Sequence, residues 1–248
     1  MRILLINPNT TEALTERLAA SARMVLPPDA ELATVTARRG FAYISSRAEA
    51  QIAGAEVLSM LAEKAGAFDA AVIAAFGDPG LSAARELFDI PVTGMSEAAM
   101  LTALSLGERF AFVTFTPRLA AWYGEQVTRA GLGGRFAGTF TPEDGFSDIR
   151  NVAEDLREPL LRTCLTASKT ADCIILAGAP IAGLADEIAG GVPAMLIDPV
   201  RAAAVQAAGL CRLFPAGASH GSFARPPAKP STGLAPALSR RMSPPEQN

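Results

Sequence analysis

The stretch "AAVIAAFGDPGLSAARE", residues 70–86, combines an apolar strand, a glycine turn and the start of a helix. The run over 70–75 has the length and composition of a buried strand in a parallel sheet. In the turn, Asp78 followed by Pro79 predicts a helix N-cap and a first helical position. Reactive side chains often follow such strands, yet this strand ends in Ala74 and Ala75, whose methyl groups perform no chemistry.

Further apolar runs of strand length alternate with helix-period stretches along the chain. Between most of them lie alanine- and leucine-rich segments. This alternation predicts an α/β fold with mainly parallel sheets flanked by helices. We expect strands at 2–6, 31–37, 70–75, 90–95, 109–115, 134–140, 173–178 and 193–198.

The sequence also contains an internal similarity. Residues 68–92 parallel residues 171–194, and a shift of 103 positions pairs Ala75 with Gly178. Any two α/β units share some likeness, so chance similarity is one explanation. We favour two pseudo-symmetric lobes, because a cleft between facing strand ends is where open α/β sheets hold ligands. Ala75 and Gly178 would then lie on either side of that ligand cleft.

We assign residues 1–98 with 202–214 to the first α/β lobe and 99–201 to the second. Residues 215–248 are rich in Pro, Ser and Ala with scattered basic residues. This composition predicts a disordered tail that contributes nothing to the core. Truncation after residue 214 should therefore leave folding unchanged.

Composition excludes several classes of function. The chain has 248 residues, half of them hydrophobic, and a net charge of −3 with the two signs interspersed, so neither nucleic acid nor a membrane is an expected partner. Three cysteines without paired spacing indicate a cytoplasmic protein. A single histidine argues against a metal site, and we expect no cofactor. The alanine-rich helices make a homo-oligomer possible.

Six stretches, in order along residues 1–212, make the sequence resemble the aspartate/glutamate/hydantoin racemase superfamily. They are "ILLINPNT" (3–10), "RGFAYISS" (39–46), "VIAAFGDPGLSAARE" (72–86), "VTGMSEAAM" (92–100), "FAFVTFTPR" (110–118) and "IILAGAPIAGLA" (174–185). The resemblance implies a cofactor-independent isomerase, a racemase that moves the proton at an alpha carbon of a small amino-acid-like, carboxylate or hydantoin-type substrate. Each lobe would supply a cysteine at the end of a central strand, because inversion needs a base and an acid on opposite faces.

The two family cysteine positions fall on Ala75 and Gly178, so both thiols are absent. Cys173 lies roughly 16 Å from Gly178 along the same strand, and Cys164 and Cys211 belong to helix patterns. Racemisation by two thiols is therefore not expected. An alternative is a non-racemising relative that uses the same cleft as a small-molecule binding protein or as a lyase or decarboxylase.

The residues expected to contact the small-molecule ligand follow strand ends. The resemblance favours Asn9 in "NPNTTEAL" as an anion- or imide-binding residue, although a helix cap is the plainer explanation. Thr114 and Thr116 in "TFTPR" carry the same two interpretations, and so does Ser45. The remaining expected contacts are Ala75, Phe76, Gly77, Gly178, Ala179 and Pro180.

Two acids are candidates to replace the thiols as catalytic groups. Asp78 is the acid nearest Ala75, although a capping carboxylate accepting amide hydrogen bonds would be acidic. Glu97 follows another strand end, where it either reaches the cleft or complements a helix dipole. Tyr43 and Tyr123 are the only phenols and thus further possible proton donors, but nothing in their spacing singles out either one.

Overall fold

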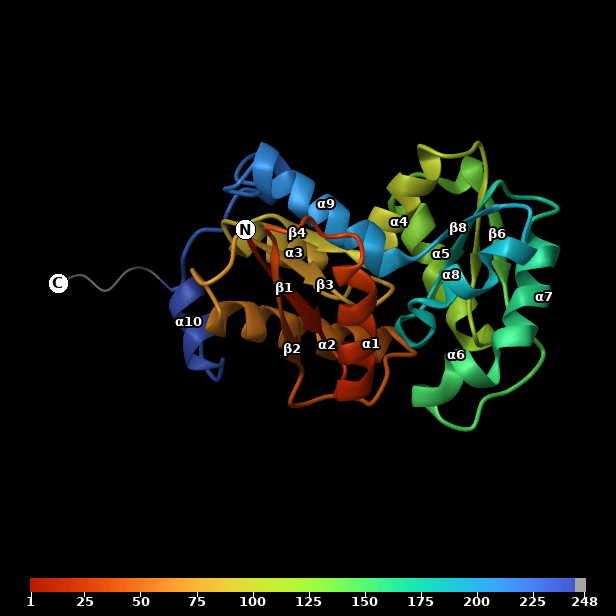
Figure 1. The fold of residues 1–248 in the computed structure, drawn as a ribbon. Helices are drawn as coiled ribbons and strands as arrows, with labels where there is room; N and C mark the ends of the chain where they lie inside the picture. Colours follow the sequence, from red (N-terminus) through yellow and green to blue (C-terminus); the bar gives the residue numbers. More distant parts are fainter. Residues whose placement is uncertain (244–248) are drawn as a thin grey trace.

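The computed structural model describes residues 1–243, which form two α/β lobes lying side by side (Figure 1). Each lobe has a four-stranded sheet, and every strand pairing is parallel. The strands are β1 (Arg2–Asn7), β2 (Glu31–Thr36), β3 (Ala70–Ile73), β4 (Val92–Gly94), β5 (Phe110–Val113), β6 (Phe136–Phe140), β7 (Cys173–Leu176) and β8 (Met195–Ile197). The sequence prediction of a two-lobed α/β fold with parallel sheets is thus confirmed.

The two sheets share one topology. Their strand orders are β2-β1-β3-β4 and β6-β5-β7-β8, so β1 corresponds to β5 and β3 to β7. The counterparts β3 and β7 begin at Ala70 and Cys173, the separation found in the sequence repeat. In both sheets the strand that follows the first crossover lies at an edge, and the carboxyl ends of the central strands lie side by side.

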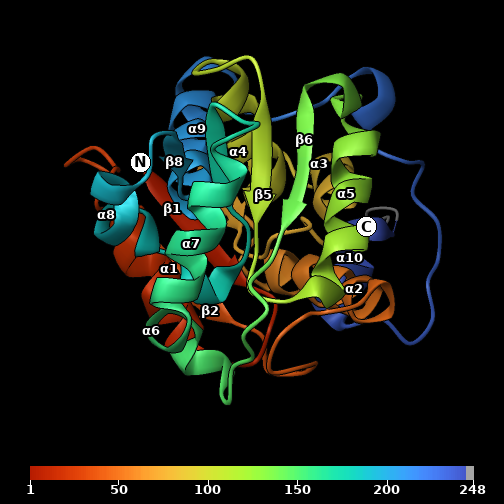
Figure 2. The same ribbon diagram turned by 90° about the vertical axis from the view of Figure 1, so that its right-hand side faces the viewer.

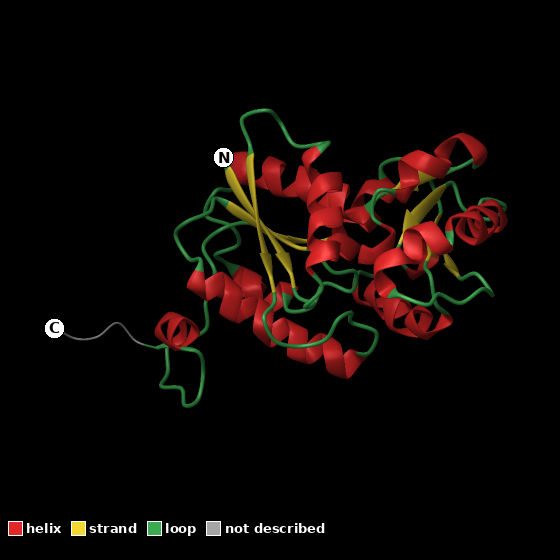
Figure 3. Cartoon of the chain, turned by 60° about the horizontal axis from the view of Figure 1, so that its bottom comes forward, coloured by secondary structure: helices red, strands yellow, loops and turns green. Residues whose placement is uncertain are grey.

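Helices cover both faces of each sheet (Figures 2 and 3). On β1, Ile3 and Leu5 pack in one apolar cluster and Leu4 and Ile6 in another, as the alternation of side chains along a strand requires.

None of the helices in residues 1–243 has the length and apolar character that a membrane span needs. The helices are α1 (Glu12–Arg23), α2 (Arg47–Glu63), α3 (Leu81–Leu87), α4 (Met95–Leu104), α5 (Ala120–Arg129), α6 (Val152–Asp155), α7 (Arg157–Ala167), α8 (Leu184–Ile188), α9 (Pro199–Leu213) and α10 (Pro236–Met242).

Helices α4 and α9 exchange between the lobes. Helix α4 follows β4 of the first sheet but contacts β5, β7 and β8 of the second. Helix α9 follows β8 of the second sheet but contacts β3 and β4 of the first, where the Thr93 hydroxyl donates to the Ala203 carbonyl at 3.0 Å. The two helices also contact each other, so one apolar cluster runs through both lobes.

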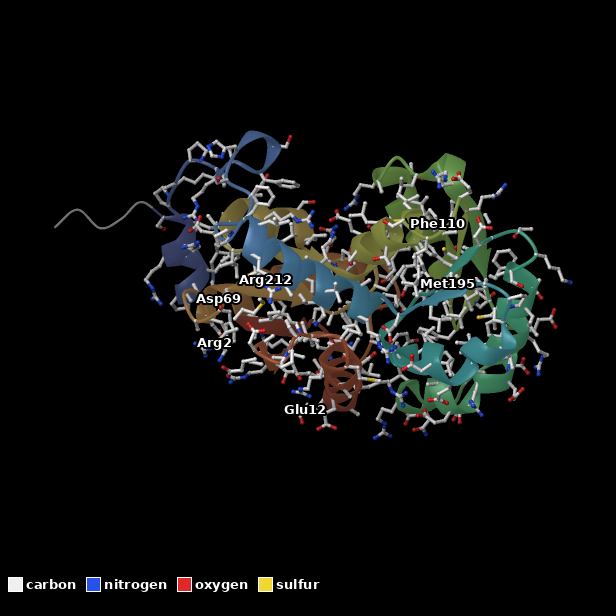
Figure 4. The ribbon with its side chains drawn as sticks, turned by 45° about the horizontal axis from the view of Figure 1, so that its top comes forward. Arg2, Glu12, Asp69, Phe110, Met195 and Arg212 are labelled. Carbon is white, nitrogen blue, oxygen red and sulfur yellow. The ribbon has the colours of Figure 1, made fainter. Side chains whose placement is uncertain are left out.

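The amino ends of the strands show the same symmetry. The Arg2 N–H donates to the Asp69 carboxylate at 2.7 Å, and the Arg109 N–H donates to the Asp172 carboxylate at 2.9 Å. In Figure 4, Arg2 and Asp69 lie in the first lobe, whereas Phe110 at the start of β5 lies in the second. Asp69 and Asp172, which are 103 residues apart, therefore make equivalent hydrogen bonds at the amino ends of the strands in the two sheets.

The segment after residue 214 differs from the disordered tail that the sequence predicted. Helix α10 contacts α2, and Leu238 is only 6% exposed in the apolar cluster beneath it. Arg225 and Arg241 both bind the Asp89 carboxylate, at 2.7 and 2.6 Å. The prediction was wrong here because it averaged composition over the whole segment and missed one short amphipathic helix. The rest of that prediction, at 244–248, lies outside the described residues.

Candidate active site

A small cavity lies between the lobes, where the carboxyl ends of the central strands meet. Its volume is about 20 Å³, room for about one water molecule. Four of its walls are the segments that follow β1, β3, β5 and β7, as expected for ligand sites in open α/β sheets. Its lining residues are Asn9, Leu14, Tyr43, Ile44, Ala75, Phe76, Phe115, Tyr123, Ala179 and Pro180.

Asn9 occupies a rigid turn after β1. Its Oδ1 accepts hydrogen bonds from Asn7 Nδ2 and from the Thr11 N–H, both at 3.0 Å, and its own N–H donates to Asn7 Oδ1. These bonds use the acceptor of the Asn9 amide and make a turn that leads into α1. Because Asn9 lines the cavity, its amide NH₂ is the group left to donate to a ligand.

The loop between β2 and α2 closes another side of the cavity. The Thr10 N–H donates to the Phe41 carbonyl at 2.9 Å, and the Thr11 hydroxyl donates to the Ala42 carbonyl at 2.8 Å. These bonds bring Tyr43 to the cavity. Ser45, a predicted ligand contact, lies just beyond: its N–H and hydroxyl both donate to the Glu49 carboxylate, while the next residue, Ser46, is the N-cap of α2.

Asp78 caps a different helix from the one the sequence predicted. Gly80, not Asp78, is the N-cap of α3, whereas the buried Asp78 carboxylate accepts from the N–H groups of Ser96 and Glu97, both at 2.8 Å. Asp78, which follows β3, therefore caps the first turn of α4, which follows the neighbouring strand β4. A Cβ at Gly94 would lie 2.3 Å from Asp78 Cγ, so this approach requires glycine there.

Burial raises the pKa of Asp78 to about 7, against the lowering effect of its two backbone hydrogen bonds. A negative charge on Glu97 acts in the same direction as burial, whereas Arg85 opposes it. The backbone of Asp78 has φ 50°, in the left-handed region where aspartate is one of the few tolerated residues. A carboxyl group that titrates near neutrality is therefore present beside the cavity, although it does not line it.

Glu97 lies away from the cavity lining. Its carboxylate binds Arg85 through two contacts, at 2.6 and 3.1 Å, and Arg85 also donates to the Val92 carbonyl at 3.0 Å. The structure thus gives Glu97 an ion pair between α3 and α4. Its predicted catalytic role stays a prediction.

The two threonines after β5 have different environments. Thr114 is fully buried, and its hydroxyl has no hydrogen-bond partner among residues 1–243. Thr116 is the N-cap of the 3₁₀ turn Pro117–Leu119, without a side-chain cap bond. Neither threonine lines the cavity, which takes Phe115 from this segment instead.

Aromatic rings of the second lobe pack directly against Gly77 and Gly178. Gly178 has φ 148°, and a Cβ added there would lie 2.7 Å from the Phe115 ring. Gly77 has φ 104°, and its Cβ would lie 2.6 Å from the Trp122 ring. The predicted contacts Ala75, Phe76, Ala179 and Pro180 do line the cavity, whereas these two glycines let the rings approach the strand ends.

Phe76 joins the lobes through its ring. It lies 5.1 Å from the Phe112 ring and 4.7 Å from the Tyr123 ring, both in edge-on geometry, which adds to the stabilisation from area burial alone. The sequence offered Tyr123 only as one of two phenols and missed Leu14, Ile44 and Phe115 as cavity residues. The strand-end position of Phe115, in the counterpart of the Asn9 turn, was the signal that could have identified it.

The three thiols take no part in the cavity. Cys164 and Cys173 are buried, and burial raises the pKa of the Cys164 thiol to about 12. Cys173 begins β7, at the end of the strand opposite the cavity. Residues 1–243 contain no group of three or more His, Cys, Asp or Glu side chains arranged to bind a metal ion.

Fold and site together define a class: two pseudo-symmetric parallel α/β lobes with a cavity between the carboxyl ends of their central strands. Residues 3–207 match the Asp/Glu/Hydantoin racemase family model. The chain belongs to this family and is a racemase-like protein.

Similar proteins span nearly the whole chain. The hydantoin racemase of Paenarthrobacter aurescens is 33% identical over 233 residues, covering 92% of this chain and 99% of the relative. The hydantoin racemase of Rhizobium meliloti is 30% identical over 241 residues, 94% of this chain and 98% of the relative. Among solved structures, the allantoin racemase from Klebsiella pneumoniae has a TM-score of 0.88 at 33% identity, covering 96% of this chain and 99% of that one.

Proposed function

We propose that the cavity binds a small, uncharged cyclic ureide of the hydantoin type and that the protein moves the proton on its alpha carbon. The observation that carries this proposal is the uncharged lining, since none of the ten cavity residues is Asp, Glu, Lys, Arg or His. An amino acid would bring an ammonium and a carboxylate into this space, and burying unpaired charges is costly. A hydantoin ring offers carbonyl acceptors to the Asn9 amide instead. Relatives named hydantoin and allantoin racemases support this choice.

The chemistry differs from a reaction between two thiols. When the alpha proton leaves, its electron pair moves to the adjacent carbonyl oxygen, and donors fixed around that oxygen stabilise the enolate. Asn9 is one such donor. Ala75 and Gly178 supply neither base nor acid, so we propose that another group exchanges the proton. Asp78, with a pKa near 7 beside the cavity, remains the first candidate.

Proton–deuterium exchange followed by NMR tests this function. The protein is incubated in heavy water with hydantoin, 5-methylhydantoin, allantoin, aspartate and glutamate, and heat-denatured protein is the control. We expect alpha-carbon exchange with the hydantoins and none with the amino acids. Exchange of aspartate or glutamate without the hydantoins would overturn the proposal. Saturable shifts of hydantoin without exchange would instead identify the binding-protein alternative.

We also propose a cytoplasmic location and a homo-oligomeric state. The cysteines form no disulfide within residues 1–243, as in proteins of a reducing compartment. Leu101 on α4, Leu106 in the turn after α4 and Val205 on α9 are 44%, 49% and 52% exposed around one shallow groove, which suits a self-association surface. Light scattering with size-exclusion chromatography tests the second point, and a monomeric mass at all concentrations would contradict it.

A further inference from the structure

Tyr123 reaches the cavity from the second lobe. It lies on α5, is 3% exposed, and packs its ring 4.7 Å from the ring of Phe76, the residue next to Ala75. The phenol therefore lies at the first-lobe strand end although it belongs to the opposite lobe. A residue in this position faces whatever occupies the space between Ala75 and Ala179.

The hydroxyl of Tyr123 is unused by the rest of the protein. No hydrogen bond within residues 1–243 engages it, whereas a buried tyrosine hydroxyl usually finds a partner. The hydroxyl oxygen is not completely enclosed by protein atoms, and Tyr123 is one of the residues that line the cavity. A buried donor without a partner costs free energy, and a ligand acceptor would recover it.

The charge state of this phenol is fixed by its surroundings. Burial, with the nearby Asp78 carboxylate in second place, raises the pKa of Tyr123 well above its ordinary value. The group is therefore neutral and carries its proton at all physiological pH values. It suits the role of hydrogen-bond donor and not that of a base.

We propose that the Tyr123 hydroxyl donates a hydrogen bond to the ligand carbonyl oxygen adjacent to the reacting carbon. This inference rests on the proposed function, which binds the ligand in the cavity that Ala75 and Ala179 line. As the alpha proton leaves, the electron pair of the C–H bond moves onto this oxygen and the hydrogen bond strengthens, while Tyr123 keeps its own proton. Tyr123 and Asn9 then bind the ligand from opposite lobes.

Two probes that differ in one carbonyl test this assignment. Hydantoin has a carbonyl next to its alpha carbon, and imidazolidin-2-one lacks that carbonyl while keeping the one between the nitrogens. Affinities of both probes are measured by NMR titration for the natural protein, Tyr123→Phe and the matched control Tyr43→Phe, which removes the other phenol of the cavity. We expect Tyr123→Phe to weaken hydantoin binding about tenfold, leave imidazolidin-2-one binding unchanged and slow hydantoin exchange. Its thermal midpoint should not fall, because the hydroxyl has no partner to lose.

The outcomes distinguish a failure of the Tyr123 assignment from a failure of the proposed function. Equal hydantoin affinity in the natural protein and Tyr123→Phe would overturn the role of Tyr123 and leave the proposed function standing. An equal loss of affinity for both probes in Tyr123→Phe would also overturn the role of Tyr123. A selective loss of hydantoin affinity in Tyr43→Phe alone would do the same. Failure of the natural protein to bind hydantoin at all would overturn both.

Discussion

Gly178 occupies one of the two positions where the family resemblance implies a cysteine. Its φ of 148° disfavours any side chain, and the Phe115 ring occupies the space that a Cβ would need. Ala75, at the counterpart strand end, already has a Cβ beside the cavity. The two positions therefore differ: a side chain is already accommodated at Ala75, whereas the Phe115 ring fills the space that a side chain at Gly178 would need.

Restoring each cysteine should consequently have unequal costs. We expect Gly178→Cys to lower the free energy of unfolding by about 1–3 kcal/mol, because the backbone is strained and Phe115 must move. Ala75→Cys should change it by less than about 1 kcal/mol. Urea denaturation of both variants measures the difference, and adding Phe115→Ala to Gly178→Cys should recover part of the loss. Equal stabilities of the two cysteine variants would contradict this account.

Asp78 makes a second prediction at the residue scale. Its pKa is raised from 3.8 to about 7, so the folded protein binds this proton more tightly than the unfolded chain. The free energy of unfolding should therefore fall as pH rises from about 4 to about 7, by up to about 1.4 kcal/mol per pH unit. Denaturation midpoints at several pH values test this, with Asp78→Asn expected to flatten the profile. A stability that rises with pH in the natural protein, but not in the variant, would show that the backbone hydrogen bonds outweigh burial.

At the scale of elements, the segment after α9 packs against the first lobe, although its amino-acid composition predicted a disordered tail. Two arginines share Asp89, both also donate to the Leu87 carbonyl at 2.9 Å, and Leu238 enters the cluster that α2 covers. Helix α2 begins at the loop that supplies Tyr43 to the cavity. The C-terminal segment thus packs against α2, the helix that follows the loop carrying Tyr43.

Leu238→Ala should lower the free energy of unfolding by about 2–3 kcal/mol, because it leaves a hole in a closed apolar cluster. Leu234→Ala, at a residue that is 41% exposed, is the matched control and should cost less than about 0.5 kcal/mol. Truncation after residue 214 should destabilise the protein at least as much as Leu238→Ala. Calorimetry on the three variants tests the packing, and a truncated protein with an unchanged melting temperature would restore the original expectation of an independent tail.

At the scale of the whole molecule, the cavity is far smaller than any hydantoin, so a ligand requires the lobes or their side chains to move. Surface ion pairs join the lobes, among them Arg47 of α2 with Glu125 of α5, whose side chains are 58% and 50% exposed. Arg17 of α1 likewise binds Glu154 of α6. Exposed pairs add little stability, so they can restrain the lobes without locking them.

Arg47→Ala should speed hydantoin association several-fold while changing the free energy of unfolding by less than about 1 kcal/mol. Arg150→Ala is the control, since its partner Asp148 lies in the same lobe. Trp122, the single tryptophan, packs beside Gly77 of the other lobe and provides the fluorescence signal for stopped-flow mixing. An association rate that is the same in both variants and the natural protein would argue that side-chain motion alone admits the ligand.

The sequence determined the eight strands, their parallel arrangement, the symmetry of the lobes and the absence of both thiols. Apolar periodicity and turn residues are local signals, and they survive in any context that buries the strands. Only the tertiary structure decided that Asp78 caps α4, that Phe115 covers Gly178 and that Tyr123 enters the cavity. Each of these contacts joins segments that are distant in the chain, and their meeting depends on how two sheets and the exchanged helices α4 and α9 pack together. Local patterns carry no record of that packing.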